Sequence, residues 1–469
     1  MTHSLRFFCL FLGLLSASFT FSAHATFSDP SPIQSFLHDN FSNTNSGMVI
    51  ALLDAHGAKI FSAGKLDNGT DQEVNANTLF EIGSITKTFT ALLALDMAHR
   101  AELSLDDTVA KCLPSSVKVP SQGGKQITLL NLAVQDSGLP FNPTNFIGNS
   151  DKEHYDSYTA EKMYAFLSGY ALKGPPGTKF QYSNLGMSLL GHVLERVSHT
   201  NFESLVLDRI CRPLHMDNTY VKLPPTSKSR MAVGHDEKGN RAPDFALQVM
   251  APAGALRSTA NDLLKYLAAE IGLTNSDLSA LMQQSQVIRH TDSPEFGNTA
   301  MPWVDQRVFN PPGTELLGHG GGTLGSTAFI GFDKLQRRGV VVLTNQRYCH
   351  APTVGWTILQ GLPLTQESFT KMVLEIAGIG AALDVDKNTK LLQITKVFPE
   401  SPASTAGFFA GLLIQKINGQ PTLDKTPDAC AQLIRGPVGT KVRLEIIDPF
   451  RNETNTVELT RQKFTTSNG

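Results

Sequence analysis

The segment FEIGSITKTFTALLALDMA, residues 80–98, places a lysine inside an almost wholly apolar stretch. Such a stretch is typical of a helix buried on most of its faces, because it has no polar side to present to water. Burying an unpaired ammonium group is costly, or it lowers the pKa of the amine until the proton is lost. Ser84 stands three residues before Lys87, so the two side chains share one helix face. A desolvated lysine amine there can take the proton of the serine hydroxyl, which turns the hydroxyl into a nucleophile.

The Ser-x-x-Lys spacing alone is weak evidence for catalysis, because a chain of this length contains it by chance. The same spacing recurs at Ser62/Lys65, Ser115/Lys118 and Ser368/Lys371. Only Ser84 stands at the start of an apolar helix, where free backbone N–H groups can stabilise an oxyanion on an attacked carbonyl group. We therefore interpret the other three as solvated surface pairs.

Two further motifs could complete a catalytic site. Tyr182-Ser183-Asn184 lies in a turn-rich loop before a predicted helix, where the phenol could reach a catalytic centre, although Ser183 or Asn184 could equally be only the helix cap. The sequence GHGGGT, residues 318–323, leads into a predicted strand. Glycines there would let a ligand lie close to the backbone, and the geometry of a hairpin would explain them as well.

The region that must position these motifs is predicted to start with two strands and to end with two strands. Residues 48–64 alternate around an Ala-His-Gly turn and predict a hairpin, and residues 326–333 and 339–346 are the strongest strand signals in the chain. Between them, helical spacing and capping residues predict helices within residues 80–98, 103–114, 127–140 and 257–270, and a further helix that includes residues 189–197. A sheet built from both chain ends with helices between them predicts an α+β or α/β domain of about 340 residues.

The composition changes near residues 362–371, and a second domain is predicted after this point. Four strand-like segments and one helix-like segment follow, which predicts a mostly β domain of about 90 residues. The whole chain of 469 residues has 41% hydrophobic and 17% charged residues and a net charge of -2, which is typical of globular domains and gives no reason to expect nucleic acid as a partner. The histidines form no H-x-H or H-E-x-x-H cluster, so neither a metal site nor a cofactor is expected.

The first 25 residues have the features of an export signal. They hold Arg6, an apolar run over residues 7–21 and the small-x-small sequence Ala23-His24-Ala25. A transmembrane anchor is the alternative, but the run is short of the ~18–20 residues needed to span a bilayer. We therefore expect a periplasmic or secreted protein without a membrane anchor, whose remaining cysteines are free rather than paired. These are Cys112, Cys211, Cys349 and Cys430.

The motifs SITK, YSN and HGG, in this order, resemble the serine β-lactamase and penicillin-binding protein superfamily in its class C-like branch. The resemblance extends over roughly residues 36–346 and includes the flanking segments 80–93, 175–191, 252–266 and 318–333. It implies an α+β catalytic domain of the β-lactamase/transpeptidase type, with an antiparallel sheet and a helical subdomain. It also implies a serine hydrolase that acts on amide or ester bonds through an acyl-enzyme.

The resemblance implies a role for each motif residue. Ser84 would be the acyl-accepting nucleophile, Lys87 its base or proton relay, and Tyr182 the general acid and base for the leaving group and for water. Asn184 would hold the substrate amide, and the backbone N–H groups of Ser84 and Gly322 would form the oxyanion hole. A phenol that faces a lysine ammonium ionises more easily, which is how a group of pKa ~10 could act near pH 7.

The sequence departs from this family at two places. His319, which is expected with Gly321 and Gly322 to line the substrate site, stands where β-lactamases and transpeptidases usually have lysine. An imidazole of unperturbed pKa ~6.5 is mostly neutral at pH 7, which weakens the case for β-lactam hydrolysis and leaves peptidase or esterase activity open. The second departure is QDSGLP, residues 135–140, where relatives commonly read His-Thr-Ser-Gly-Leu.

The C-terminal domain resembles a PDZ domain of the bacterial protease type. The similarity lies in residues 378–383, 397–420 and 433–446, although Gly411-Leu412 replaces the common Gly-Asp. Such domains bind the C-terminus of an extended peptide through backbone N–H groups, which implies binding here at Gly378, Ile379, Gly380 and Ala381.

Together these patterns predict an exported serine hydrolase with five segments. They are a signal peptide (1–25), a catalytic domain (26–362), a linker (363–372), a PDZ-like domain (373–462) and a tail (463–469). The substrate would be a small molecule or peptide, either a β-lactam, a D-amino-acid peptide of the cell-wall type or an ester. The alternative is a non-catalytic protein that keeps the fold and binds peptides through its PDZ-like domain.

Overall fold

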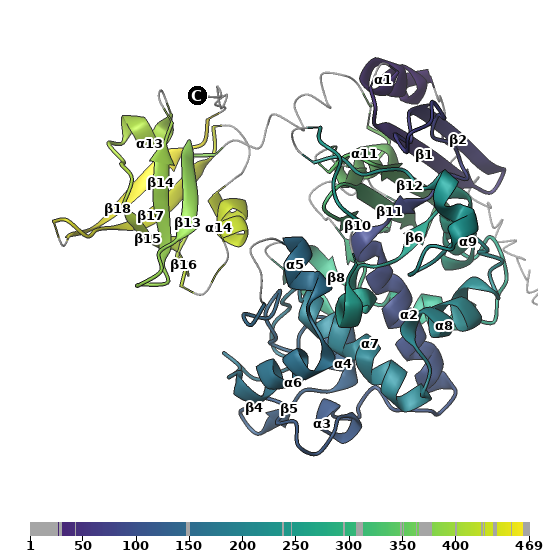
Figure 1. Cartoon of the computed structure of the whole chain (residues 1–469), viewed down its shortest axis with the longest axis horizontal. Coiled ribbons are helices and arrows are strands. Elements are labelled where there is room, and N and C mark those ends of the chain that lie inside the picture. The colour runs from purple at the N-terminus through teal and green to yellow at the C-terminus, as the bar shows by residue number, and fades with distance from the viewer. Residues whose placement is uncertain are drawn as a thin grey trace, which may run out of the picture.

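The computed structural model of the chain contains a region of helices and antiparallel strands, followed by a β-rich region (Figure 1). It describes residues 27, 31–42, 44–146, 151–236, 239–244, 246–293, 296–305, 313–347, 349, 351–362, 364, 378–398, 401–423, 425, 427–434, 439–451 and 453–462. The predicted signal peptide, the predicted tail and all of the predicted linker except residue 364 lie outside the described residues.

The first region is built on an eight-stranded antiparallel sheet with the order β2-β1-β12-β11-β10-β9-β8-β7. Strand β1 pairs with β2 in the predicted hairpin and with β12 from near the far end of the region, so the prediction of a sheet made from both ends is confirmed. The strands are β1 (Gly47–Asp54), β2 (Gly57–Gly64), β7 (His290–Ser293), β8 (Gly297–Thr299), β9 (Val304–Asp305), β10 (Leu316–Gly322), β11 (Thr327–Asp333) and β12 (Arg338–Thr344).

Both faces of the sheet are covered, which explains why every residue of β1 is buried. Met48, Ile50 and Leu52 pack in one core with helices α1 (Ser31–Phe41) and α11 (Ala351–Leu359). Val49 and Ala51 point to the opposite face, because successive side chains alternate along a strand. Helix α9 (Ala260–Glu270) covers that second face.

The predicted buried helix is confirmed as α2 (Thr86–His99), which is buried from Thr86 to Met97. It packs against α7 (Asn184–Ser198), α8 (Phe202–Val206) and α10 (Ser279–Ser285), and in Figure 1 it crosses the middle of the region. Phe89 of α2 stacks on Tyr266 of α9, with ring centroids 4.3 Å apart. Because the strand-containing part and the helical subdomain both pack against α2, the first turn of this helix has a fixed position.

The remaining elements of this region are short, and most form the helical subdomain. The predicted helices within 103–114 and 127–140 are only single turns, α3 and α4. The first ends at Leu113, which is extended and precedes Pro114, and the second ends just before Gln135, whose φ of 63° is left-handed. The elements are α3 (Val109–Cys112), α4 (Leu129–Ala133), α5 (Asp151–Asp156), α6 (Ala160–Gly169), η1 (Gly83–Ile85), η2 (Leu207–Cys211), η3 (Pro225–Arg230), η4 (Gln248–Ala253), and the strand pairs β3 (Phe80–Glu81) with β6 (Arg257–Ser258) and β4 (Ser121–Gln122) with β5 (Lys125–Gln126).

The C-terminal region is a separate small sheet with its own core. Strand β17 alternates buried Val442, Leu444 and Ile446 with more exposed neighbours, as a strand with one covered face does. The sheet order is β13-β14-β15-β17-β18, with β16 paired to β15. The elements are β13 (Ala381–Val385), β14 (Leu392–Val397), β15 (Leu413–Ile417), β16 (Gln420–Pro421), β17 (Lys441–Asp448), β18 (Glu453–Thr460), α13 (Pro402–Thr405) and α14 (Pro427–Ile434).

Two expectations about the chain as a whole can be compared with the described residues. The four cysteines among the described residues are free, as predicted, with Cys112 partly buried and the other three buried. Within the described residues, no helix has both the length and the apolar character needed to cross a membrane.

Candidate functional site

Ser84 lies in the short helix η1, which joins β3 to α2, and its side chain is half-buried. Lys87 lies in the first turn of α2 and is fully buried. Its Nζ is 2.8 Å from Ser84 Oγ and donates to the carbonyl oxygen of Ala253 at 2.7 Å. Burial lowers the pKa of Lys87 well below its ordinary value, which favours the neutral amine. Its lone pair can accept the proton of the serine hydroxyl.

Glycines bring strand β10 directly against the turn that carries Ser84. Gly83 has a φ of +50°, a left-handed conformation that a residue with a side chain rarely adopts, and a Cβ there would lie 2.6 Å from the Gly322 nitrogen. A Cβ on Gly321 would collide with the carbonyl oxygen of Ile82. Close backbone approach therefore explains Gly321 of the predicted GHGGGT motif, and it puts the exposed end of β10 beside Ser84.

His319 projects from β10 and is 4% exposed. Its Nδ1 lies 2.7 Å from the carbonyl oxygen of Gly320, which can only accept, so Nδ1 carries the proton and Nε2 presents a lone pair. Within the described residues that Nε2 is buried without a hydrogen-bond partner. Burial, with a smaller effect of Lys87, lowers the pKa of His319 to about 3. The imidazole is thus neutral throughout the physiological pH range.

Tyr182 lies in the loop before α7, as predicted, and its ring meets the other site residues. Lys87 Nζ is 4.9 Å from the centroid of the Tyr182 ring, and the His319 ring centroid is 6.2 Å away. Phe296 and Phe141 pack nearly parallel to the same ring at 5.5 Å and 6.0 Å between centroids. These contacts fix the Tyr182 ring next to the buried Lys87 amine.

The two residues after Tyr182 have different structural roles. Ser183 is the N-cap of α7, since its Oγ accepts from the Gly186 N–H at 2.8 Å. The cap interpretation was therefore correct for Ser183. Asn184 begins α7, and its side-chain amide donates to Asn142 Oδ1 at 3.2 Å. Its contact with a substrate remains a prediction.

Gln135 clamps the backbone on both sides of Tyr182, a feature that the sequence interpretation missed. Its main-chain oxygen accepts from the Gln181 N–H at 2.6 Å, and its side-chain Oε1 accepts from the Ser183 N–H at 2.7 Å. The residue has a left-handed φ of 63° and is buried. The only sequence signal was the departure at QDSGLP. A glutamine that replaces the common histidine there still supplies an acceptor.

We expect Gln135→Met to lower kcat by roughly tenfold with little change in KM, because the Tyr182 hydroxyl would lose its fixed position. Steady-state hydrolysis of an aryl ester measures both constants. Gln135→His restores an acceptor and should recover most of the loss. A kcat that stays at the parental value in Gln135→Met would show that the clamp does not position Tyr182.

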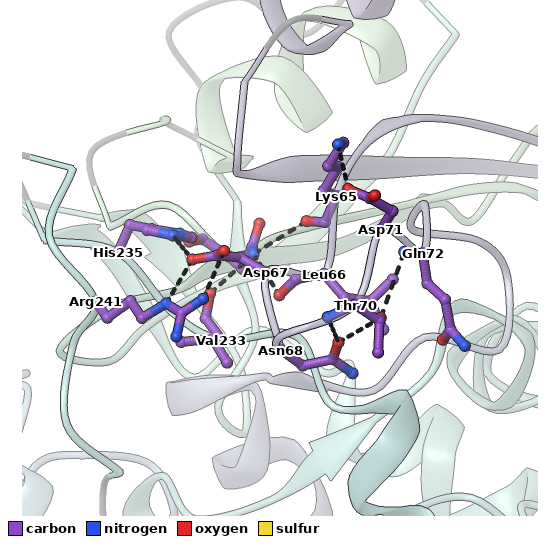
Figure 2. Close-up of polar contacts among 11 residues, drawn as sticks. Lys65, Leu66, Asp67, Asn68, Thr70, Asp71, Gln72, Val233, His235 and Arg241 are labelled. Carbon is purple, nitrogen blue, oxygen red and sulfur yellow. Dashed lines mark hydrogen bonds and ion pairs between the residues drawn. The ribbon is translucent and has the colours of Figure 1, made fainter.

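Asp67, His235 and Arg241 form a charged cluster near the turn between β10 and β11 (Figure 2). Arg241 donates two hydrogen bonds of 2.8 Å to the Asp67 carboxylate, and His235 Nε2 lies 2.9 Å from the same carboxylate. The backbone N–H of His235 donates to the carbonyl oxygens of Gly325 and Asn345, both at 2.9 Å. The cluster therefore fixes the turn between β10 and β11, and with it the end of the strand that approaches Ser84.

We expect Asp67→Asn to destabilise the fold by about 1 kcal/mol, because charge-assisted hydrogen bonds to Arg241 are weakened. Asparagine tolerates the left-handed φ of 56° at this position, so the change removes the charge without straining the backbone. The bonds to Arg241, and less so to His235, lower the pKa of Asp67 to about 2. The carboxylate therefore stabilises the protein above its ordinary pKa of about 4, and this contribution is lost as the pH falls towards 2.

Urea unfolding of parent and variant at pH 7 and at several values between pH 4 and pH 2 measures this difference. Asp71→Asn is the matched control, since Asp71 is 97% exposed and pairs with Lys65 in Figure 2, so its loss should leave the free energy of unfolding nearly unchanged. Equal effects of the two substitutions, or a pH-independent effect of Asp67→Asn, would contradict the expectation.

The structure brings together most of the residues that the sequence singled out. Ser84, Lys87, Tyr182 and His319 meet in one place, and Gly321 and Gly322 lie against the turn of Ser84. By contrast, Ser62/Lys65 lies on the hairpin strand β2 and its flank, where Lys65 pairs with Asp71. No group of three or more potential metal-ligating side chains is found in the part of the chain that the structure describes.

The predicted peptide-binding segment lies at the entry to β13 in the C-terminal region. The carbonyl oxygens of Gly378, Ile379 and Gly380 accept hydrogen bonds from within that region, and the Ile379 side chain belongs to its core. Gly380 has a φ of 73°, which favours glycine. Binding of a peptide C-terminus by the N–H groups of this segment stays a prediction.

The sequence was compared with protein families and with individual known proteins. Residues 40–360 match the β-lactamase family, and residues 393–448 match a PDZ domain. A β-lactamase of Pseudomonas fluorescens is 27% identical over 341 residues, which covers 66% of this chain and 91% of that protein. The D-alanyl-D-alanine-carboxypeptidase/endopeptidase AmpH of Escherichia coli K12 is 27% identical over 231 residues, 49% of this chain and 58% of the relative.

Solved structures show the same fold. A class C β-lactamase from Rhodobacter sphaeroides superposes with a TM-score of 0.59 at 23% identity, over 70% of this chain and 97% of the other. A β-lactamase/D-alanine carboxypeptidase from Pseudomonas syringae gives a TM-score of 0.61 at 21% identity, over 70% of this chain and 98% of the other. The predicted α+β architecture is confirmed, and the chain belongs to the β-lactamase family of serine hydrolases, with a PDZ domain at its C-terminal end.

Proposed function

We propose that this chain hydrolyses amide or ester bonds through an acyl-Ser84 intermediate. The observation that carries the proposal is the fully buried Lys87 amine, whose Nζ is 2.8 Å from Ser84 Oγ. A desolvated neutral amine at hydrogen-bond distance from a serine hydroxyl is the arrangement that activates this nucleophile. The enzymes named among the relatives make β-lactams and D-amino-acid peptides the candidate amide substrates, and esters the alternative.

In the acylation step, Lys87 Nζ takes the proton of Ser84 as Oγ forms a bond to the substrate carbonyl carbon. The negative charge on the carbonyl oxygen is stabilised by the backbone N–H groups of Ser84 and Gly322. The bond to the leaving group then breaks, and the proton passes from Lys87 through the Tyr182 hydroxyl to the leaving group. Asn184 would position the substrate amide beside the Ser84 turn.

In the deacylation step, a water molecule attacks the acyl carbonyl carbon. Its proton passes through the Tyr182 hydroxyl to Lys87 Nζ, and the bond between the acyl group and Ser84 Oγ breaks. The serine oxygen recovers its proton from Lys87, so the enzyme is regenerated and the acid product leaves.

The intact mass of the protein after treatment with an aryl phosphonate tests the proposal. We expect one stoichiometric adduct on the parent and on Ser62→Ala, and none on Ser84→Ala, because within the described residues only Ser84 has a fully buried lysine amine at hydrogen-bond distance. Ser62 is the matched control from the exposed Ser-x-x-Lys pair. A Ser84→Ala protein that still carried the adduct or still hydrolysed an aryl ester would refute the proposal, and an unmodified parent would favour a non-catalytic peptide-binding protein.

The organisation of the chain is proposed on the same basis. Residues 1–25 would be a cleaved signal peptide that directs the protein to the periplasm or the outside of the cell, and the catalytic domain (26–362), linker (363–372), PDZ-like domain (373–462) and tail (463–469) would follow. The PDZ domain would bind a peptide C-terminus through backbone N–H groups of residues 378–381. N-terminal sequencing of exported protein would locate the cleavage site, and cleavage anywhere but after Ala25 would correct the boundary.

A further inference from the structure

The hairpin of β7 and β8 lies at one edge of the eight-stranded sheet and contacts the loop that carries Tyr182. Strand β7 begins at His290, and Phe296 lies in the turn before β8. The Phe296 ring packs nearly parallel to the Tyr182 ring at 5.5 Å between centroids, and Phe180 packs edge-on against Phe296 at the same distance. The turn of the hairpin therefore contacts the loop at Phe180 and at Tyr182.

A buried pair of side chains joins the open end of the same hairpin to the segment after α4. His290 Nε2 lies 3.2 Å from Asp136 Oδ2, and the two side chains are 18% and 7% exposed. The other carboxylate oxygen, Asp136 Oδ1, accepts a hydrogen bond of 2.8 Å from the side-chain amide of Asn131 in α4. Phe180 packs edge-on against the His290 ring, with centroids 6.1 Å apart. The imidazole is thus held between the Asp136 carboxylate and a ring of the Tyr182 loop.

Asp136 is also the neighbour of the residue that clamps the backbone around Tyr182. The main-chain oxygen of Asp136 accepts from the Gly177 N–H at 2.9 Å, in the segment that leads to the loop. The preceding residue, Gln135, binds the backbone N–H groups of residues 181 and 183. Because adjacent residues share a rigid peptide unit, a shift of Asp136 would also shift the clamp.

The burial of the Asp136 carboxyl group has a cost in free energy. Burial raises the pKa of Asp136 above its ordinary value, although Asn131 and His290 act in the opposite direction. Apolar side chains would fill the same space without desolvating a charge. A buried polar pair instead favours one arrangement of the segments around it, because other arrangements leave a buried polar group without a partner.

We propose that the β7–β8 hairpin positions the Tyr182 hydroxyl, and that Asp136 and His290 are positioning residues that fasten this hairpin to the Tyr182 loop. The inference rests on the proposed role of Tyr182 in proton transfer, and both residues act through Tyr182 rather than on the substrate. With the pair intact, the loop is held at the open end of the hairpin and at its turn. Without the pair, the phenol is placed less accurately relative to Ser84, and proton transfer slows.

Two substitutions of His290 in the full mature chain test the polar contact. His290→Phe keeps a ring against Phe180 but removes the partner of the Asp136 carboxylate, so we expect kcat for an aryl ester to fall about 3- to 30-fold while KM stays within about twofold. His290→Gln keeps an N–H donor and should recover most of this loss. Asp208→Asn, which removes one member of the exposed Arg212–Asp208 pair, is the matched control and should retain the parental kcat.

A double-mutant cycle with Tyr182→Phe separates positioning of the phenol from a general structural role. In the Tyr182→Phe background the hydroxyl is absent, so we expect His290→Phe to change the residual kcat by less than about twofold. A merely structural role would lower kcat by the same factor in both backgrounds. The phosphonate adduct counts the reactive Ser84 in each preparation, so that kcat is expressed per folded active site.

Phe296→Leu tests the other contact of the hairpin and keeps the proposal testable if His290→Phe fails to fold. Phe296 is partly exposed, and its substitution should lower kcat by about 2- to 10-fold in the parent and leave the residual kcat of Tyr182→Phe nearly unchanged.

The outcomes distinguish this inference from the proposed function. A parental kcat in His290→Phe, or equal losses in the parent and in Tyr182→Phe, would overturn the inference and leave the acyl-serine chemistry intact. If His290→Phe does not fold, equal losses from Phe296→Leu in the two backgrounds would overturn it in the same way. A parent that forms no adduct on Ser84 would refute the proposed function itself, and the inference with it.

Discussion

Lys87→Met is expected to slow the acylation of Ser84 by about 10²- to 10⁴-fold, because the serine loses its general base. The same change should not lower stability, and we expect the free energy of unfolding to rise by about 1 kcal/mol or more at pH 7. The unfolded chain protonates a lysine readily, whereas burial lowers the pKa of Lys87 in the folded protein. Below the ordinary lysine pKa, the unfolded state therefore binds more protons, and the folded state loses stability as the pH falls. Methionine removes this cost while keeping a long apolar side chain, although it leaves the Ala253 carbonyl oxygen without its donor.

Stopped-flow acylation by an aryl ester and urea unfolding at pH 6, 7 and 9 measure the two effects. Lys65→Met is the matched control, because Lys65 also follows a serine by three residues but is 42% exposed and pairs with Asp71. It should leave both acylation and stability nearly unchanged. Parental acylation in Lys87→Met would remove Lys87 from the mechanism, and a large loss of stability would mean that the amine is a structural group.

Tyr182→Phe is expected to lower kcat by about 10²- to 10⁴-fold, because the proposed route of the proton to the leaving group passes through the phenol. The substitution keeps the ring that packs on Phe296 and Phe141, so stability should change by less than about 1 kcal/mol. The size of the kcat loss should depend on the leaving group, since a good leaving group needs little protonation. Aryl esters with leaving groups of increasing basicity measure this dependence.

Tyr220→Phe is the control for loss of a phenol hydroxyl, since the Tyr220 hydroxyl donates to the Asp217 carbonyl oxygen. It should retain parental kcat for every ester. A Tyr182→Phe protein whose kcat falls equally for all leaving groups would place Tyr182 in deacylation only, and one with parental kcat would exclude it from proton transfer.

The fold class could be predicted because its signals are local. The hairpin over residues 48–64, the strands that became β11 and β12, and the buried helix α2 are each encoded in a hydrophobic period within one short segment. The boundaries were less certain: Ser84 lies in η1 rather than in α2 itself, and the predicted helices around α3 and α4 are single turns. Helix α3 ends before Pro114, which the sequence shows, whereas α4 ends before the left-handed Gln135, whose hydrogen bonds to residues 181 and 183 cannot be read from the sequence.

The motif residues were predictable as a set, but their surroundings were not. The Gln135 clamp joins residues 48 positions apart, and the Asp67 cluster joins residues 174 positions apart. The near-parallel packing of Phe141, Tyr182 and Phe296 likewise depends on three loops that meet only after folding. Because these residues are far apart in the sequence, their contacts could not be predicted from the spacing of residues along the chain.

The sequence by itself determined the family resemblance, the α+β architecture, the PDZ domain and the choice of Ser84 over the other Ser-x-x-Lys pairs, because each depends on local pattern and on burial encoded within one helix. Only the tertiary structure decided the electrostatics of the site. The neutral state of His319 and the lowered pKa of Lys87 arise from desolvation by elements that are distant in the chain. Desolvation is a property of everything packed around a group, so it is determined only when the whole domain has folded.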